Sequence, residues 1–307
     1  MAGANRYTTA ELLVQIKQKG RIPPSQTPFD DPGLLNLAWD ELSTGILRQI
    51  LSTRENYYLT SIDYAYNANS TYPIPTRAIG GALATIKIIN GTVIYEVARS
   101  EIGEQFSTVT SPTGYYSFII EGSNIVIQPT SSTGTIRLYY YQRPNTLVQT
   151  TSAAQITGIS GTTLSFSAGT IPSTISTSTP CDLVQDQPPF DWAAIDQTPT
   201  AVTSTTIQFS SLPSNLAIGD WVALAGQTPV PQIPVEFRNL LVQRTIVKYN
   251  EIQGYLDKMK ASQQKLEEME KDVFELINPR VSEEQKRIVP SANVIGGYRR
   301  WRAWRAT

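Results

Sequence analysis

Apolar residues recur every three or four positions at both ends of the chain, which is the spacing of one face of an α-helix. Residues 34–50 carry one such stripe, and a longer one runs from Phe237 to Val273. We therefore predict amphipathic helices at both ends, with Gly254 as the point where the second would bend or be interrupted. The longer stripe consists of Phe237, Leu240, Leu241, Tyr249, Ile252, Leu256, Met259, Leu266, Met269 and Val273.

Polar and turn-forming residues mark where these helices begin and end. Thr8 and Glu11 have the spacing of a capping box, in which each side chain pairs with the other residue's backbone amide. Asp31 followed by Pro32 predicts the N-cap and first position of the next helix. Pro279 is expected to end the C-terminal helix.

From about Ser61 the period changes to the alternation of β-strands. Asn90-Gly91 lies between two strand-like runs and predicts a hairpin. A second hairpin is expected around residues 121–124, and "GTIRLYYYQRP" predicts a further strand closed by Pro144. These strands read as an antiparallel meander.

Residues 149–228 are rich in Ser, Thr, Gly and Pro and contain short strand-like runs such as "TTLSFSA" and "DWVALAG". Such composition is typical of a linker. Because the strand-like runs recur with turns between them, a small inserted β-domain is the favoured interpretation.

The pattern predicts an α+β fold, in which N- and C-terminal helices pack as a helical bundle, with an antiparallel β meander and a small inserted β-domain. The expected parts are N-terminal helices in 1–66, an antiparallel β region in 67–148, the inserted β-domain in 149–228, C-terminal helices in 229–289 and an Arg/Trp-rich tail in 290–307.

Composition narrows the function classes. Histidine is absent and Cys181 is the single cysteine, so His-dependent catalysis, His- or thiolate-ligated metal sites and an intrachain disulfide are excluded. The formal net charge of −1 does not fit a dedicated nucleic-acid binder. With neither a signal-peptide pattern nor an apolar run of membrane-spanning length, synthesis in the cytosol is expected.

Two stretches raise the question of a ligand site. Asp182, Asp186, Asp191 and Asp196 could supply a glycosidase carboxylate pair, but their sequence context favours turn aspartates. "YYYQRP", Tyr139 to Pro144, could stack on sugars or bases, but alternating tyrosines of a strand are more often half-buried. We therefore predict no enzyme, no cofactor and no metal.

The chain ends on "GGYRRWRAWRAT", where arginine alternates with aromatic residues. Such a tail could bind nucleic acid, lie on a membrane or dock on a protein. Protein docking is favoured, because Trp, Tyr and Arg are the residues enriched in interface hot spots. The expected docking residues are Tyr298, Arg299, Arg300, Trp301, Arg302, Trp304 and Arg305.

The layout resembles the head-to-tail adaptor (connector) proteins of tailed bacteriophages. The similar stretches are the helical segment 8–60, the strand pair 122–148 with its aromatic-Arg-Pro turn, the Pro-rich segment 229–252 that leads into a long helix, and the Arg/Trp tail.

This resemblance implies a structural virion protein at the neck, between capsid and tail. It implies a ring, usually of twelve subunits, that binds the portal protein through the tail and a downstream tail or nozzle protein on its other side. DNA would be passing cargo only, and no membrane would be involved. The alternative is a virion receptor- or carbohydrate-binding protein that uses the inserted β-domain.

Overall fold

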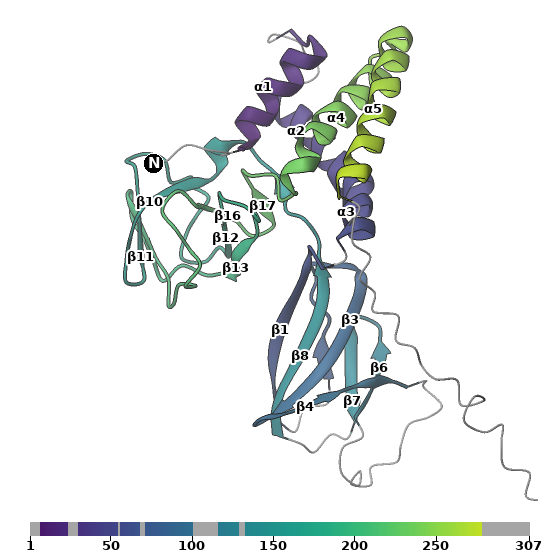
Figure 1. The fold of residues 1–307 in the computed structure, drawn as a ribbon. Coiled ribbons are helices and arrows are strands. Elements are labelled where there is room, and N and C mark those ends of the chain that lie inside the picture. The colour runs from purple at the N-terminus through teal and green to yellow at the C-terminus, as the bar shows by residue number, and fades with distance from the viewer. Residues whose placement is uncertain are drawn as a thin grey trace, which may run out of the picture.

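The computed structural model describes residues 7–23, 30–54, 56–67, 71–100, 116–128 and 133–277. Helices from both ends of the chain lie together, and two β regions project from one end of them (Figure 1). The predicted mixed α+β class is confirmed, and nearly all strand pairs are antiparallel.

The N-terminal helices begin close to where the capping residues predict. Helix α1 (Thr9–Gly20) has Thr8 as its N-cap, and the capping box with Glu11 is formed. Helix α2 (Asp31–Glu41) is capped by Asp30 rather than Asp31, since the Asp30 carboxylate accepts the Gly33 amide at 2.9 Å. It continues through one π-helical segment (Leu42–Ile46) into α3 (Leu47–Thr53).

The long C-terminal stripe does not form one helix. A 3-10 turn (Val235–Phe237) leads into α4 (Arg238–Ile252), the chain reverses at Gly254, and α5 (Leu256–Ile277) runs back along α4 (Figure 1). Gly254 has φ +71°, a left-handed conformation that costs other residues energy and that a helix cannot contain. The sequence predicts a long helix that bends or is interrupted at Gly254, and the structure shows a helical hairpin with its turn there.

One apolar core joins the N- and C-terminal helices. Helix α4 lies against both α1 and α2, and nine of its residues are buried. The largest contributors from the two ends are Leu12, Ile16, Leu34, Leu35, Leu42, Ile46, Phe237, Leu240, Leu241 and Ile246.

The strands of residues 59–142 form two four-stranded sheets. One has the order β1-β8-β3-β4, from β1 (Leu59–Asn67), β8 (Thr133–Gln142), β3 (Ala78–Asn90) and β4 (Val93–Glu96). The other has the order β2-β7-β6-β5, from β2 (Thr71–Pro73), β7 (Asn124–Gln128), β6 (Ser117–Glu121) and β5 (Ala98–Arg99). The two share one apolar core, built from residues such as Tyr66, Ile88, Ile125, Ile127, Ile136 and Leu138.

The predicted meander is therefore wrong, although its hairpins exist. Asn90 pairs with Val93 and Glu121 with Asn124, so the turns are Gly91-Thr92 and Gly122-Ser123. Strand β8 does not follow its chain neighbours but inserts between β1 and β3, where alternate residues such as Leu138 are fully buried. A two-residue turn is encoded locally, whereas this insertion depends on partners distant in the sequence.

The Ser/Thr-rich segment contains a seven-stranded sheet of order β13-β12-β16-β10-β11-β15-β14 with its own apolar core. Its strands are β10 (Ala154–Ser160), β11 (Thr163–Phe166), β12 (Cys181–Val184), β13 (Trp192–Gln197), β14 (Ala201–Val202), β15 (Thr206–Gln208) and β16 (Trp221–Leu224). A short parallel pair between β9 (Thr146–Leu147) and β17 (Gln227–Thr228) closes the segment beside the helices. The exact domain boundaries stay a prediction.

Candidate functional site

The buried charged side chains concentrate where the helices and the β regions meet. Asp182 on β12 is fully buried and accepts two hydrogen bonds from Arg77, which precedes β3, at 2.6 and 3.0 Å. It also accepts the Asn145 side-chain amide at 2.7 Å and the backbone amides of Gly226 and Asp196 at 2.9 and 3.0 Å. We call these five residues the Arg77–Asp182 junction.

The junction connects three segments that are far apart in the sequence. Arg77 belongs to the first β region and Asn145 to the connection after β8, while Asp182 and Asp196 belong to the inserted sheet and Gly226 to the turn after β16. Arg77 also donates to the Asp196 carboxylate at 2.6 Å. Burial alone would lower the pKa of Arg77, but its bonds to Asp182 and the charge of both carboxylates raise it overall. The junction therefore holds the two β regions in one orientation through charge-assisted hydrogen bonds.

A second buried cation lies at the start of α4. The Arg238 guanidinium stacks between the rings of Tyr7 and Phe190, 4.4 and 4.3 Å from their centroids. Phe190 adopts φ +61°, which is unfavourable for a residue with a side chain, while its ring is buried. The stack thus ties α4 to the loop before β13 and to the segment before α1, in cation–π geometry.

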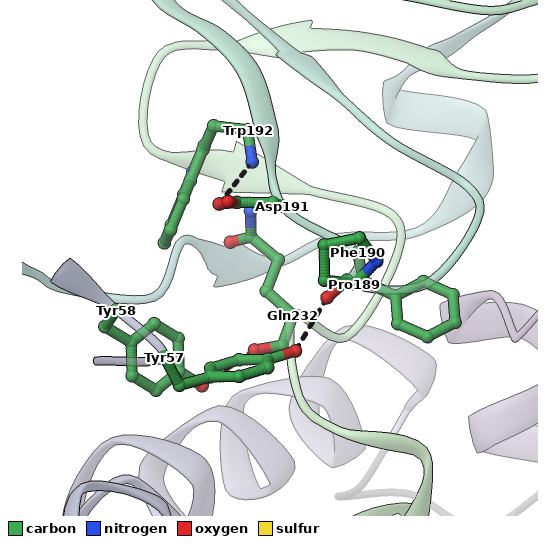
Figure 2. A pocket seen from close by; sticks show the side chains of 7 residues that line it. All are labelled: Tyr57, Tyr58, Pro189, Phe190, Asp191, Trp192 and Gln232. Atoms are coloured by element: carbon green, nitrogen blue, oxygen red, sulfur yellow. Dashed lines mark hydrogen bonds between the residues drawn. The ribbon is translucent and has the colours of Figure 1, made fainter. Parts of the chain in front are cut away.

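A small pocket lies beside this stack, and Figure 2 shows the residues that line it. The Tyr57 hydroxyl donates to the Pro189 carbonyl and the Tyr58 hydroxyl to the Gln232 carbonyl, both at 2.7 Å. Burial raises the pKa of both tyrosines, so both remain neutral donors. The cavity of about 40 Å³ is far smaller than a small-molecule site. This pocket is a packed junction of aromatic side chains.

The aspartates singled out from the sequence have structural partners. Asp182 and Asp196 share Arg77, and Asp191 accepts the backbone amide of Trp192 at 2.8 Å. Asp186 is buried next to Asp220, whose carboxylate accepts the Asp186 amide at 2.9 Å. Asp186 and Asp191 lie in the loop between β12 and β13, as the turn interpretation expects, whereas Asp182 and Asp196 lie on these strands, so that expectation is wrong for them. The partners of the four residues fit structural side chains better than a carboxylate pair at an open cleft.

The tyrosines at the end of β8 are half-buried, as the sequence pattern favours. Tyr140 is buried, while Tyr139 is partly exposed with the Lys87 ammonium 5.6 Å from its ring centroid. Pro144 is buried at the end of the run. Tyr141 is partly exposed like Tyr139, so the run is half-buried rather than a row of fully exposed rings.

The predicted docking residues Tyr298, Arg299, Arg300, Trp301, Arg302, Trp304 and Arg305 lie outside the described residues.

An apolar surface that the sequence did not single out lies at the turn between α4 and α5. Ile252, Tyr255 and Leu256 are 49%, 39% and 64% exposed. We call these three residues the hairpin tip. Ile252 and Leu256 belong to the predicted stripe, so their exposure results from the reversal at Gly254 rather than from a change in sequence pattern.

Across the described ranges, no three or more acidic or cysteine side chains gather in a way that could hold a metal ion. None of the helices in these ranges is both long and apolar enough to cross a membrane.

One family model matches the chain over residues 7–168, and its description is "SU10 adaptor protein". The match covers more than half of the 307 residues and runs from α1 through β11, so α4 and α5 lie outside it. No curated protein matches the chain.

Proposed function

Since the chain belongs to the SU10 adaptor protein family, a family of phage adaptors, we propose that it forms a ring that joins the capsid portal to the tail. The family match is the observation that carries this proposal. It covers both the N-terminal helices and the first β region, so it does not rest on a short motif. Membership in a structural adaptor family also fits the expectation of a virion protein without enzymatic activity.

In this proposal the C-terminal tail is the portal-docking element. Arginine offers bidentate contacts to carboxylates, and tryptophan and tyrosine offer large rigid apolar surfaces, so the tail combines both kinds of hot-spot residue. About twelve identical tails on one ring would bind with high avidity, because each bound tail raises the effective concentration of the next. The seven residues from Tyr298 to Arg305 named above would make these contacts.

The channel of such a ring would continue the path of the DNA and would not retain it. A formal net charge of −1 over the whole chain supports this role, since strong binding to the duplex needs a basic surface. The opposite side of the ring would meet a downstream tail or nozzle protein.

The test is reconstitution with the cognate portal ring, imaged by electron microscopy. The full chain and a version without residues 298–307 are compared at equal concentration. We expect a coaxial second ring only with the full chain, while both versions keep the same circular dichroism spectrum. A matched variant with lysine at all four tail arginines keeps the charge but loses bidentate geometry, and we expect it to dock more weakly.

Two outcomes contradict parts of the proposal. If the truncated chain forms an equally stable ring complex, the tail is not the docking element. If neither version binds the portal, the adaptor role falls, and glycan binding by the inserted β-domain becomes the function to test on a glycan array. A tail that instead bound DNA would lose affinity steeply with added salt.

A further inference from the structure

Helix α5 is packed far less deeply than the other long helices. None of its residues is fully buried, whereas α4 buries nine. Its inner face rests on the helical core through only partly buried side chains, namely Leu266, Met269, Val273 and Ile277. A helix held in this way needs little free energy to leave its place.

Polar contacts on α5 converge on two residues of its inner side. The Glu270 carboxylate accepts hydrogen bonds from Arg244 and, at 3.1 Å, from Gln49. At Ser262, the backbone carbonyl accepts the Gln243 side-chain amide at 2.9 Å, and the hydroxyl lies 3.2 Å from the Asn250 amide nitrogen. The groove for α5 is therefore built by α3 and α4, and it recognises these particular positions of α5.

The turn between α4 and α5 is Gln253-Gly254-Tyr255, and an apolar helical stripe continues on both sides of it. Tyr249, Ile252, Leu256 and Met259 continue one helical stripe straight through it, with spacings of three, four and three. Polar residues, Gly and Pro usually occupy turns. Gln253 and Gly254 supply the reversal: Gly254 adopts φ +71° with open space where a Cβ would be, and the amides of Gly254 and Tyr255 donate to the Glu251 and Asn250 carbonyls, as at a glycine-terminated helix.

We propose that α5 is exchanged between copies of this chain. The hairpin opens at Gly254, α4 and α5 become one continuous helix, and α5 of each copy enters the groove on α3 and α4 of a second copy. The occupant is a second copy because the groove is shaped for Glu270 and Ser262 of this same helix. The exchange needs no portal, so it goes beyond the proposed function and does not depend on it.

Exchange keeps every contact of α5 and changes only the turn. In the closed hairpin, Ile252 and Leu256 lie exposed at the tip. In the open state they lie in the middle of a continuous helix that spans two copies. A helix of 22 residues reaches about 33 Å at 1.5 Å per residue, which is enough to cross to a neighbouring subunit. Short hinge segments are where such swaps originate, and head-to-tail swaps close into rings.

Residue 254 sets the balance between the two states. Alanine at this position is penalised in the left-handed turn and is favoured over glycine within a helix. Together the two effects shift the equilibrium toward exchange by roughly 30-fold. Asparagine tolerates the left-handed conformation, so Gly254→Asn should stay close to the parent.

The test uses the full chain carrying Asn250→Cys and Ser262→Cys, positions whose side chains touch across the hairpin. Under mild oxidation, a closed hairpin forms an intrachain disulfide, and exchanged helices form covalent multimers that a non-reducing gel separates. Cys181 is buried and does not interfere. We expect the ratio of covalent multimers to intrachain disulfide to rise roughly 30-fold when Gly254→Ala is added, and little with Gly254→Asn.

Two controls make the result decisive. The first control combines Asn250→Cys with Gln264→Cys, whose side chain is exposed. Covalent multimers formed by this pair report random collisions between chains. Gly169→Ala strains an open left-handed turn elsewhere (φ +76°) and reports general destabilisation. The proposal is overturned if Gly254→Ala yields multimers only at the collision level, or if Gly169→Ala raises them equally. Portal docking is measured separately, so either idea can fail alone.

Discussion

Removal of the Asp182 carboxylate is the sharpest test of how the two β regions are held together. In Asp182→Ala, Arg77 loses its two bonds to Asp182, and the side-chain amide of Asn145 and the backbone amides of Gly226 and Asp196 lose their acceptor. Arg77 keeps its bond to the exposed Asp196 carboxylate. The change therefore leaves several donors unpaired in the protein interior.

The expected loss is large for a single side chain. Breaking a buried ion pair by removing one partner costs about 3–5 kcal/mol, because the remaining charge and donors lack their hydrogen bonds. Buried donors left unsatisfied cost about 1–3 kcal/mol each where water cannot reach them. Since Arg77 retains one carboxylate partner, we expect a destabilisation of about 3–5 kcal/mol.

Hydrogen exchange measures this effect where it occurs. Peptides that contain the Gly226 and Asp196 amides should lose protection by roughly 140- to 4,000-fold in Asp182→Ala. Peptides of α1 and α2 serve as the internal reference. Urea unfolding followed by circular dichroism gives the overall change.

The chain contains a matched control on its surface. Arg137 donates two hydrogen bonds of 2.7 Å to Asp63, the same bidentate geometry as at the junction, but both side chains are well exposed. We expect Asp63→Ala to leave the free energy of unfolding nearly unchanged, since exposed ion pairs contribute little. Equal and small effects of the two substitutions would refute the reasoning that burial, rather than pairing geometry, makes the junction matter.

Three further predictions concern single side chains. Burial raises the pKa of the Cys181 thiol to about 12, so a thiol reagent at pH 8 should modify the folded protein very slowly and the urea-unfolded protein at once; fast labelling of the folded chain would contradict this. Burial also raises the pKa of the Asp220 carboxyl group, so the NMR signal of its carboxyl carbon should titrate above the ordinary value of 3.8. The shift stabilises the folded state in full below pH 3.8, and this stabilisation is lost as the pH rises through the folded pKa. A titration midpoint below 3.8 would reverse that sign. Gly134→Ala places a Cβ 2.5 Å from the Ile89 carbonyl oxygen and should lower the melting temperature by several degrees more than Gly122→Ala, where that space is open; equal shifts would argue against the close approach of β8 and β3.

Features that depend on near neighbours in the chain were predictable. The capping box at Thr8, the strand character of residues 133–142 and both two-residue hairpins follow from side-chain spacing alone. The cap of α2 moved by one residue, from Asp31 to Asp30, because both side chains can cap and only backbone geometry decides between them. The resemblance of four stretches of the chain to phage head-to-tail adaptors indicated a phage adaptor, which the family match supports.

The candidate site could not be predicted in the same way. Arg77 and Asp182 are 105 positions apart, and neither stands in a motif. Arg238 belongs to an ordinary helical stretch until Tyr7 and Phe190 enclose it. Such groupings are decided by which elements pack together, and no local pattern carries that information.

The same division applies to the whole molecule. The sequence by itself determined the periods of the elements, their caps and tight turns, and the absence of histidine, because these depend on residue types a few positions apart. Only the tertiary structure decided that β8 lies between β1 and β3 and that α5 folds back at Gly254. In both cases several arrangements satisfy the local pattern equally well, and burial of apolar surface against distant segments selects one of them.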